Sequence, residues 1–224
     1  MITRFVNYFI SIKQFFIISF IKAGVLPWFL GVALLTFSLA SDNFLTTQNI
    51  MGVARHSTDL ILVAMAQMIV MLTAGLDFSV GVILAMTSVV ASMTMVALWS
   101  GYGTGWEAIF IGCLAGLLIG ACIGLVNGLG VAFLRVPPFI MTLGMSSIIF
   151  GLALTITGGI PIYGAPESFT NTFGYGTFLG ISLSIWVTLF FIGIVYIFLN
   201  LTKMGRYFYA IGGNVRAAEL FTRQ

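Results

Sequence analysis

Charged side chains are scarce in this chain: they make up 7% of its 224 residues, whereas soluble domains carry about 25%. Hydrophobic residues account for 60%. A water-soluble protein of this composition would have too few polar side chains to cover its surface. The scarcity of charge therefore excludes the soluble globular class and indicates an integral membrane protein. The net charge of +3 is also too small to indicate a nucleic-acid partner.

The residues that most often carry catalytic and metal chemistry are few as well. His56 is the only histidine, and no cysteine lies near it, so the sequence offers no metal site. Cys113 and Cys122 would lie about 13 Å apart along a helix and on opposite faces, which excludes a disulfide between them there. No Walker A motif, catalytic carboxylate pair or Ser/His/Asp set is present. We therefore expect no catalytic residue, no cofactor and no ATP hydrolysis by this chain itself.

Six apolar stretches approach the roughly 20 residues that a helix needs to cross a bilayer. They are Gly24–Ala40, Leu60–Leu76, Phe78–Leu98, Ala108–Leu129, Phe139–Thr157 and Leu179–Asn200. The second and third form one run, which as a single helix would be about 58 Å long, far more than a bilayer. We therefore predict an all-α membrane domain with six spans over residues 24–200. The chain is expected to fold back at Gly75, Asp77, Ser79 and Gly81.

Basic residues lie almost entirely on one side of these predicted spans. Of the nine, only Arg55 falls on the other side. Because Lys and Arg concentrate in cytoplasmic loops, both ends of the chain are expected to be cytoplasmic. Residues 1–23 carry polar side chains at helical spacing, which favours an interfacial helix against the lipid of the inner leaflet. A cleavable signal peptide ending at Ser38-Leu39-Ala40 is the alternative, although its basic region would be too long.

Asp77 is the only charged residue in the 47 residues from Leu60 to Trp106. Ionisable residues inside a membrane often serve ion coupling, so one hypothesis makes Asp77 the site of a proton- or cation-coupled transporter. The charge asymmetry instead places it at the cytoplasmic end of a helical hairpin. There it would cap the helix that begins near Phe78, with Ser79 as a competing cap. We favour this role as hinge and cap.

Glycine recurs every four residues along the predicted helix Ala108–Leu129. The residues are Gly112, Gly116, Gly120, Gly124 and Gly128. Each step of four residues turns a helix by about 400°, so the glycines form a slowly drifting groove that admits another helix backbone. We expect this groove to pack within the chain, with a dimer seam as the alternative.

Two polar segments lie outside the predicted spans. The outer one, Gly158–Phe178, is either a docking surface for a soluble partner or a plain connecting loop. The cytoplasmic one, residues 201–224, is basic and punctuated by glycine. Asn214 is a suitable N-cap for a short helix through Ala217 and Ala218. Such a helix either transmits force from a soluble motor or anchors the chain to the inner leaflet.

Four sequence blocks carry a resemblance to a known family. They are GLDFSVG at 75–81, NGLGVAFLRVPPFIMTLG at 127–144, GGIPIYG at 158–164 and GRYFYAIGGN at 205–214. In this order and spacing, the chain resembles the permease subunits of bacterial ABC importers for ribose and related simple sugars. The resemblance covers about Asn43 to Leu220. It implies a multi-pass protein of the bacterial inner membrane that has no catalysis of its own.

The resemblance also implies partners and residue roles. The partners are a second permease subunit (the same chain or a paralogue), cytoplasmic ATP-binding subunits and an extracytoplasmic sugar-binding protein. The cytoplasmic turn of the family matches Arg135, Pro137 and Pro138. The segment that contacts the ATPase matches Gly205, Arg206, Gly212, Gly213, Asn214, Ala217 and Ala218. The family pattern fades at residues 221–224, whereas family members continue with further spans, so we expect a chain without their carboxy-terminal part. A membrane scaffold that transports nothing is a third interpretation.

Overall fold

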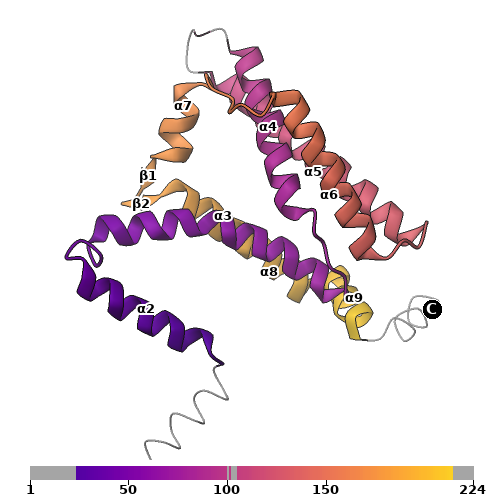
Figure 1. Cartoon of the computed structure of the whole chain (residues 1–224), viewed down its shortest axis with the longest axis horizontal. Coiled ribbons are helices and arrows are strands. Elements are labelled where there is room, and N and C mark those ends of the chain that lie inside the picture. Colours follow the sequence, from indigo (N-terminus) through magenta and orange to yellow (C-terminus); the bar gives the residue numbers. More distant parts are fainter. Residues whose placement is uncertain (1–23, 100, 102–104, 214–224) are drawn as a thin grey trace, which may run out of the picture. The chain divides into compact units, whose positions relative to one another are not determined.

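The computed structural model describes residues 24–99, 101 and 105–213, so the segments predicted at residues 1–23 and from Asn214 onward lie outside the described part. The described chain is almost entirely helical (Figure 1). Five of its helices are long and apolar enough to cross a membrane. They are α3 (Thr47–Leu72), α4 (Val80–Leu98), α5 (Trp106–Ala132), α6 (Pro138–Thr157) and α8 (Leu183–Leu201). The predicted all-α membrane fold class is confirmed.

The first predicted span is shorter than the others. Helix α2 runs from Leu26 to Ala40, and its 15 residues amount to about 22 Å of helix, less than a hydrocarbon core of about 30 Å. Pro27 fixes its start, because proline fits the first turn of a helix, and Ser41 ends it in an extended conformation. The described residues therefore hold five full-length spans and one shorter apolar helix, where the sequence predicted six spans.

Helix α3 begins at Thr47, well before the predicted start at Leu60. The Thr46 hydroxyl caps it by accepting a hydrogen bond from the Asn49 N–H at 3.4 Å, and Asn49 Nδ2 donates to the Phe44 carbonyl at 2.8 Å. The early turns are too polar to be recognised as part of a span, but a capped helix extends at little cost once it is nucleated. The chain divides into two compact units between Val53 and Ala54, within this helix. The contacts described below all lie in the second unit.

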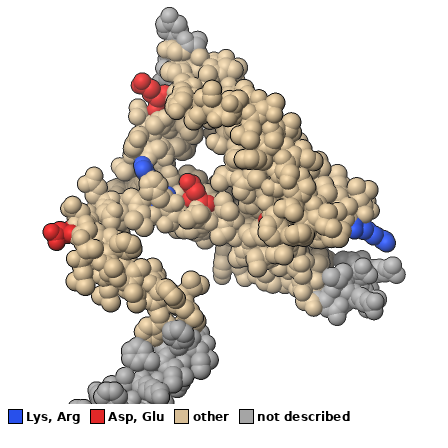
Figure 2. Space-filling view, viewed as in Figure 1, with Lys and Arg blue, Asp and Glu red and all other residues tan. Residues whose placement is uncertain are grey.

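Helices α4, α5 and α6 share a common core and run side by side (Figure 1). Met86 of α4, Ile123 of α5, and Ile149 and Ala153 of α6 form the buried cluster. Outside this core the surface stays apolar: Figure 2 shows few charged side chains, and large side chains such as Phe110 are exposed. A continuous apolar surface of this kind suits lipid or further membrane helices rather than water.

Two glycines of α5 bring its backbone close to α4. A Cβ atom at Gly112 would overlap the Met95 side chain and lie 2.8 Å from the Ala91 carbonyl oxygen. A Cβ at Gly116 would lie 3.0 Å from the Thr87 carbonyl oxygen. Such backbone approach is how membrane helices gain dispersion contacts when lipid offers no hydrophobic drive.

The glycine groove meets α4 over only part of its length. A Cβ at Gly120 would lie 2.9 Å from the Thr87 methyl carbon, whereas a Cβ at Gly124 or Gly128 would meet nothing within 4 Å. Successive glycines are rotated by about 40° around the helix, so Gly124 lies about 120° away from Gly112. The first three glycines therefore pack within the chain, and the last two face open space.

The segment between α6 and α8 contains regular structure. It forms the short helices α7 (Glu167–Phe169) and η1 (Thr170–Gly174), then an antiparallel hairpin of β1 (Thr177–Phe178) and β2 (Ile181–Ser182). Leu179 and Gly180 make the hairpin turn with φ of 53° and 77°, as a type I′ turn requires. The prediction that the last span begins at Leu179 is therefore wrong, because that residue closes the hairpin and α8 begins at Leu183.

Candidate functional site

A buried polar network lies at the turn between α3 and α4. Asp77 Oδ1 accepts hydrogen bonds from the Ser79 N–H at 2.7 Å and the Ser79 hydroxyl at 2.6 Å. Asn127 of α5 in turn donates from Nδ2 to Ser79 Oγ at 2.8 Å. Ser79 is 0% exposed and Asn127 is 6% exposed. Because a buried polar group is costly to leave unpaired, these bonds hold the turn firmly against α5.

The same turn is also tied to α6. Thr142 Oγ1 accepts a hydrogen bond from the Phe78 N–H at 3.1 Å and donates to the Pro138 carbonyl at 2.8 Å. The Phe78 and Phe139 rings stack edge to face, with centroids 5.2 Å apart. Two of the family-like blocks, at residues 75–81 and 127–144, therefore meet in space at one end of the α4–α5–α6 bundle.

The predicted helix cap at this turn is corrected by the structure. Helix α4 begins at Val80 with Ser79 as its N-cap residue, and the Ser79 side chain makes no capping hydrogen bond. The Asp77 carboxylate instead closes a turn onto Ser79, two residues ahead, in the manner of an Asx-turn. At either end of the motif, the Gly75 N–H donates to the Val70 carbonyl at 3.2 Å, while Gly81 has open space beside it.

The turn between α5 and α6 places the other motif residues. Arg135 is left-handed, with φ of 56°, a conformation uncommon outside glycine and asparagine. The next residue, Val136, donates its N–H to the Gly130 carbonyl at 3.2 Å. Pro137 then precedes α6 and Pro138 begins it, because the N–H that proline lacks would have no partner in a first helical turn. Two reversals of the chain thus share this end of the bundle.

A short amphipathic helix, α9 (Lys203–Gly213), follows α8 directly. Thr202 separates the two: its backbone is extended, and its hydroxyl accepts the Gly205 N–H at 3.1 Å as an N-cap does. This helix was not predicted from the sequence, because Gly205 and Gly212 lower helix propensity. Thr202, a suitable N-cap residue, was the feature of the sequence that could have predicted where this helix begins. The helix predicted to begin at Asn214, with Ala217 and Ala218, lies outside the described residues.

Glycines of α9 contact the ends of two membrane helices. A Cβ at Gly205 would lie 2.5 Å from the Phe198 carbonyl oxygen of α8. A Cβ at Gly212 would overlap the Leu72 carbonyl oxygen at the end of α3 and lie 3.0 Å from its carbon. Gly213 has no atom within 4 Å of such a position, and Arg206 is exposed. Helix α9 therefore touches α3 immediately before the turn that contains Asp77.

Arg55, the one basic residue predicted on the outer side, has a local structural role. Its guanidinium donates a hydrogen bond to the Gly174 carbonyl and lies 5.6 Å from the centroid of the Tyr175 ring. These contacts fasten η1 to α3. A cation over an aromatic face is stabilised, so the contact with Tyr175 supports the Arg55 guanidinium in this position.

Comparison with known proteins shows what kind of molecule carries these features. Over residues 49–222 the chain matches the family described as "branched-chain amino acid transport system / permease component". The chain belongs to this permease family. All five membrane-length helices and α9 fall almost wholly within the matched residues.

Several relatives of this permease are named for sugars. It is 33% identical over 181 residues to the D-allose transport system permease protein of Escherichia coli K12, covering 81% of this chain and 53% of that protein. It is 34% identical over 199 residues to the L-arabinose ABC transporter permease protein of Azospirillum brasilense, covering 89% of this chain and 56% of that protein. It is 34% identical over 190 residues to the ribose import permease protein of Escherichia coli K12, covering 82% of this chain and 56% of that protein.

The predicted resemblance to sugar-importer permeases is thereby confirmed. The permease spans about half the length of the curated relatives it matches. No solved structure matches it. With five membrane-length apolar helices in a permease family, it is a multi-pass membrane protein.

Proposed function

We propose that this permease is a membrane-spanning subunit of an ATP-driven importer for ribose or a related simple sugar. The observation that carries the proposal is one uninterrupted family match that extends over the membrane helices into α9. The sugar relatives on that match supply the substrate class. The subunit forms part of the wall of the translocation path, and ATP is hydrolysed elsewhere.

In this assembly α9 receives the movement of the ATPase. Its Gly212 lies against the Leu72 carbonyl, and the chain from Leu72 leads directly into the turn held by Asp77. That turn is bonded to Asn127 of α5 and Thr142 of α6. A displacement of α9 would therefore reach three membrane helices through contacts between backbone and buried side chains, which deform little.

The partners proposed are a second permease subunit, cytoplasmic ATP-binding subunits and an extracytoplasmic sugar-binding protein. We propose an orientation with both ends of the chain in the cytoplasm, supported by the distribution of basic residues. The α9 segment and the Asp77 turn then lie on the cytoplasmic side, and the β1–β2 hairpin lies outside.

The source of energy tests this proposal. In cells that carry the complete importer, we expect uptake of radiolabelled D-ribose to require the ATP-binding subunit and to continue after the proton gradient is collapsed. L-Arabinose and D-allose serve as parallel substrates. Uptake that persists without the ATPase but stops when the gradient is collapsed would contradict an ATP-driven importer.

The alternative function, a secondary transporter that uses Asp77, is tested by Asp77→Asn. An asparagine carbonyl still accepts both bonds from Ser79, although neutral bonds are roughly half as strong as charge-assisted ones. We expect uptake within about threefold of wild type, with an unchanged dependence on pH. If Asp77 carried the coupling proton, uptake by the variant would fall to background and its pH dependence would disappear.

A further inference from the structure

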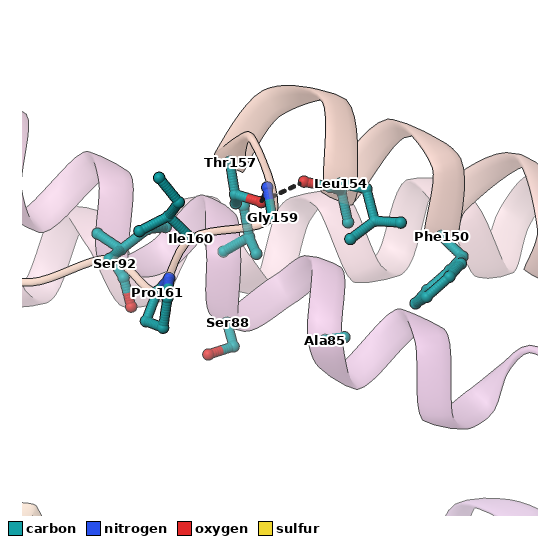
Figure 3. Close-up of a pocket in the computed structure, with 12 residues that line it drawn as sticks. Ala85, Ser88, Ser92, Phe150, Leu154, Thr157, Gly159, Ile160 and Pro161 are labelled. Atoms are coloured by element: carbon teal, nitrogen blue, oxygen red, sulfur yellow. Dashed lines mark hydrogen bonds between the residues drawn. The ribbon is translucent and has the colours of Figure 1, made fainter.

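A cavity of about 460 Å³ lies between α4 and α6, under the segment that follows α6 (Figure 3). Helix α4 contributes Ser88 and Ser92, helix α6 contributes Phe150 and Thr157, and the following segment contributes Pro161. Ser88 lies about 12 Å along α4 from Val80, where the helix begins. The cavity is therefore separated from the Asp77 turn, and it lies beside the middle of α4 and the last two turns of α6.

In the described part of the chain, the hydroxyl groups of the two serines that line the cavity are not bonded to the helix backbone. Most hydroxyls on these helices bond to their own backbone: Thr87 donates to the Leu84 carbonyl at 2.8 Å, and Thr94 donates to the Val90 carbonyl at 2.7 Å. Ser88 and Ser92 make no such bond within the described residues. They are four residues apart, so both lie on the helix face that lines the cavity.

The roof of the cavity is fixed in place. The Gly159 N–H donates to the Leu154 carbonyl and to Thr157 Oγ1, each at 3.1 Å. Thr157 Oγ1 also donates to the Ala153 carbonyl at 2.9 Å. The segment 159–162, which belongs to one of the family-like blocks, is therefore held over the cavity by its first residue (Figure 3).

The chemistry of the lining selects a class of ligand. None of the lining residues is charged, and hydroxyl groups stand beside apolar surfaces from Phe150, Ile160 and Pro161. An ion would find no opposite charge here, whereas a sugar offers hydroxyls to the serines and C–H faces to the apolar groups. The volume also falls within the roughly 300–1,000 Å³ typical of small-molecule pockets.

We propose that this cavity is a subsite for a neutral polyhydroxylated solute, with Ser88 and Ser92 as its hydrogen-bonding residues. The inference rests on the proposed function, since the solute would be the transported sugar. With both chain ends in the cytoplasm, the cavity lies toward the outer side of the membrane, where the solute would enter the translocation path. The measurements described next distinguish a failure of the subsite from a failure of the proposed function.

The first measurement is uptake of D-ribose by the complete importer carrying Ser88→Ala and Ser92→Ala together. We expect about a tenfold loss of uptake, because each lost hydrogen bond contributes modestly on its own. Ser147→Ala on α6 is the matched control: its exposed hydroxyl bonds to its own helix at the Leu143 carbonyl, and uptake should stay at the wild-type level. Wild-type uptake by the double variant would overturn the subsite.

The second measurement is protection from chemical labelling. Ser92→Cys is introduced into a Cys113→Ala, Cys122→Ala background and treated from outside with a membrane-impermeant maleimide. We expect labelling that slows several-fold with D-ribose but not with the same concentration of gluconate, which is a charged polyol. A labelling rate that is unchanged by D-ribose would overturn the subsite. Absence of labelling in an importer that transports normally would also overturn it. Protection by D-ribose in an importer that shows no ATP-dependent uptake would uphold the subsite and remove the proposed function.

Discussion

Replacing Gly212 with alanine is expected to reduce sugar uptake to about a tenth of wild type or less, with an unchanged amount of protein in the membrane. The added methyl group would overlap the Leu72 carbonyl oxygen at the end of α3. Both groups belong to helix termini, so neither can move aside as a flexible side chain would. An overpacked contact costs about 1–3 kcal/mol, and about 1.4 kcal/mol corresponds to a factor of ten.

A glycine of α8 provides the control for this result. A methyl group at Gly193 would meet no atom within 4 Å, and Gly193 lies outside the segment expected to contact the ATPase, so Gly193→Ala should transport sugar normally. The measurement is uptake of radiolabelled D-ribose together with sugar-stimulated ATP hydrolysis in the reconstituted importer. In Gly212→Ala we expect ATP hydrolysis to continue without uptake, because only the contact between α9 and α3 is displaced. Equal uptake by the two variants would show that this contact does not transmit movement.

Replacing Gly112 with valine is expected to destabilise the protein by about 2–3 kcal/mol. The new side chain would collide with Met95 and with the Ala91 carbonyl oxygen, which lies 2.8 Å from the position of its Cβ. Helix α5 would then have to move away from α4, and the buried cluster around Met86 and Ile123 would lose its packing. Thermal unfolding in detergent should show a fall in Tm of roughly 5–10 °C.

The same substitution at Gly124 separates packing from helix propensity. Valine has the same intrinsic cost at both positions of α5, but a Cβ at Gly124 meets nothing within 4 Å. Gly124→Val should therefore melt close to wild type when the permease is studied alone. Equal falls in Tm for Gly112→Val and Gly124→Val would mean that helix propensity, and not contact with α4, determines the stability.

The sequence located the membrane helices because their composition is a direct consequence of the bilayer. Predicted and observed ends agree within two residues for α4 and α6, where Ser79 and the Pro137-Pro138 pair mark the boundaries. The prediction failed where a polar segment continues a helix, as at the start of α3. It failed again at Leu179, where an apolar residue serves a hairpin turn instead of a span. In both cases local hydropathy gave no signal, since capping and strand pairing decided the structure.

The polar residues of the candidate site were recognised only in part. Asp77 and Ser79 stood out as a charge and a cap signal, but the sequence assigned them to α4 alone. Asn127, the partner of Ser79, is 48 residues further along the chain, and Thr142, the partner of the neighbouring Phe78, is 64 residues further along. No spacing rule relates either pair. Likewise, Ser88 and Ser92 are unremarkable serines in an apolar helix until α6 and the segment after it close a cavity beside them.

By itself, the sequence determined that this protein is a helical membrane permease and where its main spans lie. It could do so because each helix in lipid must satisfy its own backbone hydrogen bonds and present an apolar surface. Only the tertiary structure decided which faces meet: three of five glycines against α4, Gly212 against Leu72, and Asn127 against the turn of Asp77. Lipid is as apolar as the helices, so their association depends on shape and on a few buried hydrogen bonds, and neither is visible before the chain is folded.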